Sequence, residues 1–585
     1  MQRTAKLAFD DQTELLRSLG LSEDFADQTL RRLSSLGRSG TVPGNVHRDL
    51  VLYLGEPSTP KTFKTSIHVQ LQKGKKGKSN VVSVNMSFLL PHEYFNYLYT
   101  KRRSLFDSTI LEGDPNTLPS FWQGAQERND PRFAELQKTS VVRKPDWMKK
   151  AVPLSIHGDA VPVIQVGKPG TKSLEVVSHQ SVVAVDGSSL LLKQPVCAVF
   201  EQSKVKSSDV NTDNEIGQVL LWSYKALQDG HWPAEDHRGR RYDAASAEGQ
   251  LAGQALAGGF CGVLYLIKSD LDFLAKSLGL RHYGANEPCD ICRCSKAGPP
   301  DLWPTNFRDD SGWVNALFTT DEWRALYEKT PHWVFELQHL SQHNVEGDEL
   351  HIIWLGTASW TGGSVIWMLV FRVMAGSATT NMEALWAQIT QCYSEFGTSA
   401  QYSSLTMSSF CEPKSPSSHY PKLKGKAAEV KSLSAVLRKV WAANMNPESP
   451  EHKLVLALLD NQLALQRIID EHAGELFLAS GKADELLTRI KEFLLIYTKL
   501  GHYAGERGDL LWNMTPKFHW LCHLGQRARY MSPRRAACWL DEDYVGKCKK
   551  VAHACAPGTP LHQIPSNMLE KMRWGLDQLH AQRCK

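Results

Sequence analysis

Three cysteines lie within six residues of the chain, at Cys289, Cys292 and Cys294. The C-x2-C spacing lets two thiolates bind one tetrahedral Zn²⁺, and Cys294 could supply a third thiolate. The first residues lack the apolar core of a secretory signal, so we expect an intracellular, reducing compartment, where clustered cysteines favour metal over disulfide. We therefore predict a zinc site, with His351 as the leading further ligand and His282 behind it. Reduced cysteines without a metal are the alternative.

Asp159 is a candidate ligand of a different kind, because it follows the short apolar segment 152–157 and Gly158. Carboxylates that converge from distant segments can hold divalent cations such as Mg²⁺ or Mn²⁺. We expect Gly158 to let the backbone turn tightly beside the acid. A simple turn, without any chemistry, is the alternative for this pair of residues.

A second acid stands directly after the continuous apolar run 263–267, which is typical of a buried central strand. Asp270 lies at the end of this predicted strand, and Asp272 lies slightly further into the next helix. We favour Asp270 over Asp272 as the metal ligand. Either residue could instead serve only to cap the helix.

Asp348 and His351 form a D-x2-H motif later in the chain. Their i, i+3 spacing places both side chains on one face of a helix. A purely structural role as a helix cap is the alternative to a role in chemistry.

The elements that must position these residues can be read from apolar periodicity. Short apolar segments predict three consecutive strands, a helix that begins near Thr212 and Asp213, and then the strand at 263–267. The three first strands are expected at 152–157, 174–185 and 196–200. The order is therefore β-β-β-α-β, with acids at the ends of the first and fourth strands.

This order of strands and acids, followed by C-x2-C and then D-x2-H, resembles the catalytic region of eukaryotic cut-and-paste DNA transposases. The resemblance is closest to the CACTA/Mirage/Chapaev-like group and covers residues 151–570. It implies an α/β (α+β) fold, in which an RNase H-like mixed sheet is interrupted by a large, mainly helical insertion. The clearest helical stripes, at 454–469 and 486–500, would belong to that insertion.

The resemblance also implies a third acid on a late helix that packs on the sheet. Glu542 is the best match, in the segment Cys538–Lys547, with Asp541 and Glu383 as alternatives. Consecutive acids at a helix start also suit the helix dipole without catalysis. In the family, the D-x2-H motif belongs to the insertion and supports the active-site region, which implies this role for Asp348.

The function implied is cleavage of DNA phosphodiesters and joining of 3′ ends, with Asp159, Asp270 and Glu542 as ligands of two Mg²⁺ (or Mn²⁺) ions. The expected partners are DNA at transposon ends and further copies of the chain, and the expected compartment of a working transposase is the nucleus. The second hypothesis is a domesticated or degenerate copy that acts as a non-enzymatic, zinc-containing nucleic-acid or protein-binding module.

The composition of the chain limits the classes of protein and of partner that these hypotheses can involve. The chain has 585 residues, 42% of them hydrophobic and 22% charged, as in a soluble globular protein. No window approaches ~18 unbroken apolar residues, so a membrane role is not expected. The net charge of +5 is mild, so contact with nucleic acid must come from local patches. Lys73–Lys78 and the cluster of Lys144, Lys149 and Lys150 could contact phosphate or form solvated loops.

Four regions follow from these patterns. Residues 1–150 form an irregular N-terminal region of unknown role, with a helix expected at 11–37. Residues 151–288 form the first part of the sheet core, 289–510 the cysteine motif and the helical insertion, and 511–585 the part that returns to the core.

Overall fold

The computed structural model describes residues 56–72, 79–164, 171–207, 209–328 and 332–583. Its centre is a mixed five-stranded sheet with the strand order β5-β4-β3-β6-β7. β3 pairs antiparallel with β4, and β4 pairs antiparallel with β5, whereas β3–β6 and β6–β7 are parallel pairs. The strands are β3 (Ala151–Ile164), β4 (Thr171–Ser181), β5 (Gln194–Phe200), β6 (Cys261–Ser269) and β7 (Val345–Gly347). The mixed α/β character expected from the sequence is confirmed.

The first four of these strands lie where apolar periodicity predicts them. All nine residues of β6 are buried, as expected for a strand covered on both faces. The predicted end of the first strand at His157 is wrong, because β3 continues to Ile164 in its pairing with β4. Only the parallel pairing with β6 ends there, at the pair His157 and Lys268. Asp159 therefore lies within a strand, just beyond the last residue that pairs with β6.

The two faces of the sheet are covered by different helices. On one face, Ile156 and Ile267 line a small cavity together with residues of α11 (Thr212–Asp229). On the other face, His157 and Lys268 approach Asp541 of α22 (Trp539–Cys555). Because side chains alternate along a strand, Asp159 is directed to the same face as His157, toward α22.

Buried charges hold α22 against the sheet. Asp541 is fully buried and forms ion pairs with Lys193 and, at 2.8 Å, with Lys268. In the sequence, 348 residues separate Lys193 from Asp541. Val545 and Val551 of the same helix are buried. The C-terminal part of the chain therefore returns to pack on β3 and its neighbours, and α23 (Ile564–Arg583) follows it along β5.

The described parts of the N-terminal region, residues 56–72 and 79–150, are more regular than the sequence predicts. β1 (Phe63–Gln72) and β2 (Ser79–Phe88) form an antiparallel hairpin, and helices follow up to residue 150. These helices are α5 (Pro91–Lys101), α6 (Arg103–Ile110), α7 (Thr117–Glu127), α8 (Pro131–Leu136) and α9 (Trp147–Lys150). Aromatic residues such as Phe95 and Trp122 belong to the core that these helices form. The helix expected at 11–37 and the run Lys73–Lys78 lie outside the described residues.

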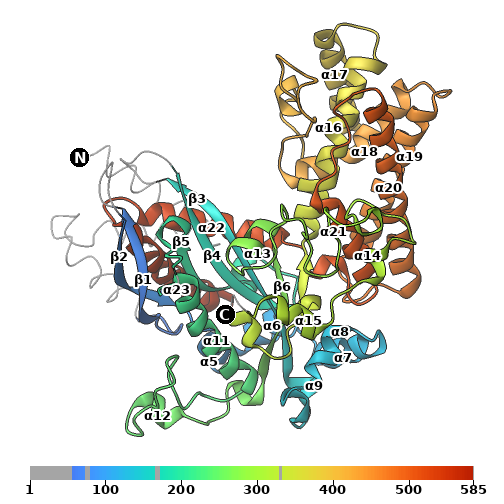
Figure 1. Ribbon diagram of the computed structural model, residues 1–585. Coiled ribbons are helices and arrows are strands. Elements are labelled where there is room, and N and C mark those ends of the chain that lie inside the picture. Colours follow the sequence, from blue (N-terminus) through green and yellow to red (C-terminus); the bar gives the residue numbers. More distant parts are fainter. Residues whose placement is uncertain (1–55, 73–78, 165–170, 208, 329–331, 584–585) are drawn as a thin grey trace.

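A group of long helices projects from one side of the sheet (Figure 1). It includes the two helices predicted at 454–469 and 486–500, which are observed as α19 and α20. Its helical segments are η8 (Leu350–Thr357), α16 (Ala358–Met368), η9 (Leu369–Val373), α17 (Ala378–Phe396), α18 (Ala427–Asn444), α19 (Pro450–Glu471) and α20 (Ser480–Glu506). β7 lies inside the range 289–510 yet belongs to the sheet, so the projecting helices begin only after this strand.

One segment of the described chain, Leu350–Val373, is long and apolar enough to cross a membrane by length and composition. However, 89% of its most apolar window is buried inside the protein. A helix at the centre of a helical bundle has the same composition, because neighbouring helices cover it on all sides.

Candidate functional site

Two cysteines and two histidines from distant parts of the chain meet in the interior. The ligand atoms of Cys289, Cys292, His519 and His523 all lie within 4.8 Å of one another, and all four residues are buried. The histidines lie on α21 (Pro516–Arg527), which follows the projecting helices, and the cysteines lie on the loop after α13 (Leu271–Lys276). We call these four residues the Cys2His2 group.

The distances within the Cys2His2 group fit a tetrahedral ion. Nε2 of His523 lies 3.5 Å from Sγ of Cys289, and Nε2 of His519 lies 3.3 Å from Sγ of Cys292. The two Nε2 atoms are 3.1 Å apart. Tetrahedral zinc with Zn–S of ~2.3 Å and Zn–N of ~2.0 Å would place such atoms roughly 3.3–3.6 Å apart. The donor set therefore fits a metal such as zinc without rearrangement of the backbone.

Hydrogen bonds orient both imidazoles toward the thiols. Nδ1 of His519 lies 3.1 Å from the carbonyl oxygen of Pro304, and Nδ1 of His523 lies 2.9 Å from Oε1 of Gln526. Because these partners accept, each Nδ1 carries the hydrogen and each Nε2 keeps its lone pair for a metal. Trp313 packs against both rings and excludes water from this side.

The histidine ligands proposed from the sequence are not those that the structure brings to the cysteines. His351 is bound to Asp348 and lies beside Glu542, and His282 is exposed. Cys294 is buried and interacts with the other two thiols, but it lies outside the group of four. The missed signal is the H-x3-H spacing at 519–523, which together with C-x2-C is a common ligand pattern for zinc.

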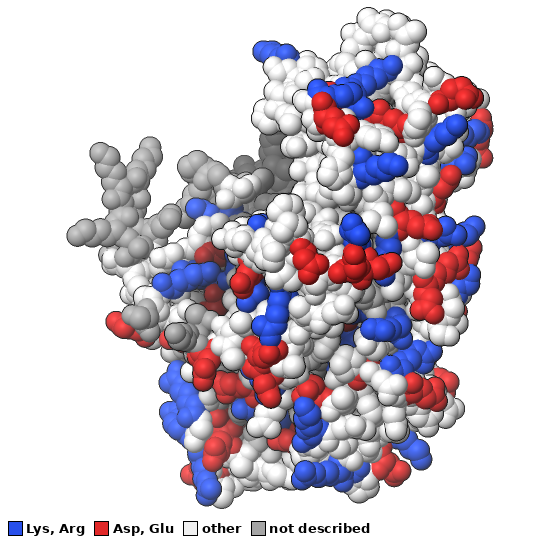
Figure 2. Space-filling model, turned by 45° about the vertical axis from the view of Figure 1, so that its right-hand side comes forward, with Lys and Arg blue, Asp and Glu red and all other residues white. Residues whose placement is uncertain are grey.

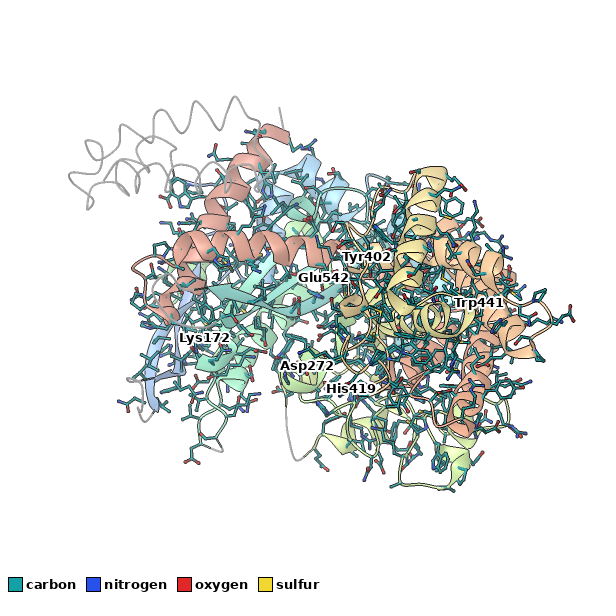
Figure 3. All side chains as sticks on the ribbon, turned by 90° about the horizontal axis from the view of Figure 1, so that it is seen from above. Lys172, Asp272, Tyr402, His419, Trp441 and Glu542 are labelled. Carbon is teal, nitrogen blue, oxygen red and sulfur yellow. The ribbon has the colours of Figure 1, made fainter. Side chains whose placement is uncertain are left out.

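A second cluster contains the acids singled out in the sequence. Asp159 lies on β3, Asp270 caps α13 after the neighbouring strand β6, and Glu542 lies in the first turn of α22. Figure 3 shows Glu542 where the end of α22 faces the projecting helices. We call Asp159, Asp270 and Glu542 the carboxylate cluster. In the described chain, the ligand atoms of the Cys2His2 group all lie within 4.8 Å of one another. Those of the carboxylate cluster do not.

The carboxylates of this cluster act on one another electrostatically. Burial and the negative charge of Glu542 raise the pKa of Asp159 to about 7, and Asp270 contributes in the same direction. Burial also raises the pKa of Glu542, and the charge of Asp270 adds to this effect. An excess of negative charge in a half-buried place is the property that a bound cation relieves.

His351 provides a positive charge beside this cluster. Burial opposes its protonation, but the 2.5 Å hydrogen bond to Asp348 and the charges of Asp348 and Glu542 raise the pKa of His351 to about 9. Its Nε2 lies 3.6 Å from Oε1 of Glu542. The imidazolium thus holds Glu542 from the side of the projecting helices.

Asp348 accepts hydrogen bonds from the backbone N–H groups of Leu350, His351 and Cys538. Asp348 therefore fixes the start of η8 and also the segment that leads into α22. Asp348 also contacts His351, as their i, i+3 spacing allows, and His351 in turn lies beside Glu542.

The alternative acids lie in other surroundings. Asp272 forms a 2.6 Å ion pair with Lys276 on its own helix. Glu383 is exposed and belongs to α17, a helix at the far end of the projecting group (Figure 1). Asp541 is neutralised by buried lysines under the sheet. The backbone of Gly158 is not left-handed; the ring of Phe273 instead occupies the space that a Cβ atom at this position would need. The predicted tight turn at Gly158 is wrong.

Lys517 is a basic side chain near the carboxylate cluster, because its charge interacts with that of Asp270. Burial and the charge of Lys422 lower the pKa of Lys517 to about 8, although Asp270 and Asp348 oppose this. By contrast, Lys144 donates to the carbonyl oxygen of Gln228 at the end of α11 and Lys150 to that of Gly258 before β6, which is a structural use of both lysines. Figure 2 shows acidic and basic side chains interspersed over one face of the molecule.

A scan of protein-family models finds no match to this chain, and a search of curated proteins finds no similar sequence.

Proposed function

We propose that this protein is a DDE/D-type transposase-like enzyme with an RNase H-like core, which cleaves DNA phosphodiesters and transfers the 3′ ends. The observation that carries the proposal is the placement of three acids from distant segments around one end of the strand pair β3–β6. The strand order, with an antiparallel meander beside two parallel strands, supports the same reading.

The chemistry of the donor set supports divalent cations at the carboxylate cluster. Asp159, Asp270 and Glu542 would hold Mg²⁺ (or Mn²⁺), which when bound activates a water or 3′-hydroxyl and stabilises the leaving oxygen. The protein itself contributes three functions. Asp348 and the protonated His351 orient Glu542, buried Asp541 seats α22 on the sheet, and Lys517 offers a positive charge for a phosphate oxygen.

The Cys2His2 group would hold structural zinc. The Cys2His2 group connects two segments. One is the loop after α13, the helix that Asp270 caps, and the other is α21, the helix that contains Lys517. A metal here would therefore fix the relative positions of segments on either side of the carboxylate cluster. DNA with transposon ends, further copies of the chain and a nuclear location belong to the same proposal.

The test is nicking of supercoiled plasmid DNA by the full-length protein with Mg²⁺ or Mn²⁺. Glu542→Gln, Asp159→Asn and Asp270→Asn should each reduce cleavage by orders of magnitude. Asp543→Asn and Asp272→Asn are matched controls, because Asp543 is exposed and bonds Ser189 and Lys547, and Asp272 pairs with Lys276. The controls should cleave like the unmodified protein.

A binding measurement separates loss of chemistry from loss of metal. Mn²⁺ should raise the melting temperature of the unmodified protein but not that of Glu542→Gln. Two results would contradict the proposal that the protein is a metal-dependent nuclease. One is DNA cleavage by the Glu542→Gln variant, and the other is a melting temperature of the unmodified protein that Mn²⁺ does not change.

The second candidate is a zinc-containing nucleic-acid or protein-binding module that has kept the fold and lost the chemistry. The spacing of the carboxylate cluster, wider than 4.8 Å, favours this alternative. It predicts DNA binding without Mn²⁺-dependent cleavage, and equal binding by the Glu542→Gln variant.

A further inference from the structure

A cavity of about 170 Å³ lies between α5, the segment after α11, and α12 (Ala247–Leu251). This volume is more than ten times the ~10–15 Å³ that one water molecule needs. α12 lies at the end of the molecule away from the projecting helices (Figure 1). The side chains that argue for a ligand are His92, Glu93, Trp222, Trp232, Tyr242 and Glu248. We call this cavity the α5–α12 pocket.

Aromatic rings form much of the wall of the α5–α12 pocket. The ring of His92 meets Trp222 at a centroid distance of 5.1 Å and Trp232 at 5.6 Å, in both cases edge to face at 82°. The indole N–H of Trp222 donates to the carbonyl oxygen of Glu235 at 2.8 Å, which fixes that ring. His92 is held in turn by the hydroxyl of Ser223. The rings are therefore in place before any ligand arrives.

The charges in the α5–α12 pocket are negative. Glu93 is half-buried, Glu248 is exposed at the rim, and neither forms an ion pair with a lysine or arginine of the described chain. Burial and the charge of Glu248 raise the pKa of Glu93 to about 7. Burial lowers the pKa of His92 to about 3, so the imidazole adds no positive charge at neutral pH. A cation would relieve the repulsion between the two carboxylates.

We propose that the α5–α12 pocket binds a methylated ammonium group, such as the side chain of a methylated lysine. Aromatic faces attract a cation through their quadrupole, and methyl groups replace the hydration shell that an unmodified ammonium keeps. Glu93 and Glu248 neutralise the charge, and Glu93 can accept an N–H where the ammonium carries fewer than three methyl groups. The site is independent of the carboxylate cluster and of DNA cleavage.

The test is a calorimetric and tryptophan-fluorescence titration of the full-length protein. The probes are Nα-acetyl-Nε-trimethyllysine amide, choline and 3,3-dimethyl-1-butanol, which has the shape of choline without its charge. We expect both cations to bind at least tenfold more tightly than the neutral alcohol. Tighter binding of the lysine derivative assigns the ligand to a modified protein, and tighter binding of choline assigns it to a small quaternary ammonium compound.

Variants connect the binding to this pocket. Trp222→Ala and Glu93→Gln should each weaken binding of the cations at least tenfold. Glu248→Lys, at an exposed position where folding is not at risk, should abolish it by placing an internal ammonium at the rim. Trp303→Ala is the control, because Trp303 is 45% exposed and lies outside the pocket. Equal binding of the neutral alcohol, no binding of either cation, or full binding by Glu248→Lys would overturn the proposal.

Discussion

Replacing Cys292 by serine should remove the metal from the Cys2His2 group and destabilise the protein far more than the loss of one hydrogen bond would. Serine is a poor ligand for zinc, and the three ligands left cannot complete a tetrahedral site. We expect the purified protein to contain about one equivalent of zinc and the Cys292→Ser variant to contain almost none.

The magnitude follows from the length of chain that the metal closes. Cys292 and His519 are 227 residues apart in the sequence. The chain-entropy relation for a cross-link gives about 5 kcal/mol for a loop of this length. Without a metal, the same pair contributes one neutral hydrogen bond, worth ~1 kcal/mol. The free energy of unfolding should therefore fall by several kcal/mol in Cys292→Ser, and by a similar amount when a strong chelator is added to the unmodified protein.

Metal analysis by mass spectrometry and urea unfolding with and without chelator measure both quantities. His523→Gln should behave like Cys292→Ser. Cys294→Ser and His351→Gln should keep the metal, because these residues lie outside the Cys2His2 group. Cys392→Ser is the control for replacing a buried cysteine elsewhere. The reasoning is refuted if the unmodified protein contains less than roughly a tenth of an equivalent of zinc, or if Cys294→Ser loses the metal.

Two further predictions concern stability. Asp541→Asn should lower the free energy of unfolding by about 3–5 kcal/mol, because it leaves Lys193 and Lys268 buried without their counter-charge. Asp543→Asn, two positions along the helix, should change it by no more than about 0.5 kcal/mol, and equal effects would disprove the buried-charge account. Burial also lowers the pKa of several histidines to about 4, below the ~6.5 of an unfolded chain; examples are His179, His332 and His339. Between these two values the unfolded state binds more protons, so stability should fall as the pH drops from about 6.5 toward 4. Urea unfolding at pH 7 and pH 5 tests this, and His339→Gln should reduce the difference.

Much of the fold could be predicted from the sequence, because local patterns of apolar residues indicate its strands and helices. Continuous or alternating apolar residues identify β3, β4, β5 and β6, and the 3.6-residue stripes identify α19 and α20. β7 was missed because its three residues are too few to show a period. The helices between residues 91 and 150 were missed because they are short, and only packing against the rest of the core shows that their aromatic residues are buried.

The candidate metal site also has one part that the sequence predicts and one part that it does not. The C-x2-C spacing is local, so the sequence by itself points to Cys289 and Cys292 as metal ligands. The pairing of these thiols with His519 and His523 depends on α21 packing against a loop more than two hundred residues earlier, and no local pattern states that contact.

The choice between Asp541 and Glu542 is the clearest example of a question that the sequence alone cannot decide. Adjacent residues on an α-helix point about 100° apart, so the sequence shows two equivalent acids at one helix start. The way α22 lies on the sheet turns Asp541 toward Lys193 and Lys268, and leaves Glu542 facing His351 and the carboxylates. Residue types and spacing determined which groups could bind metal; tertiary packing alone decided which of them meet, because that depends on how a rigid helix is rotated against a distant sheet.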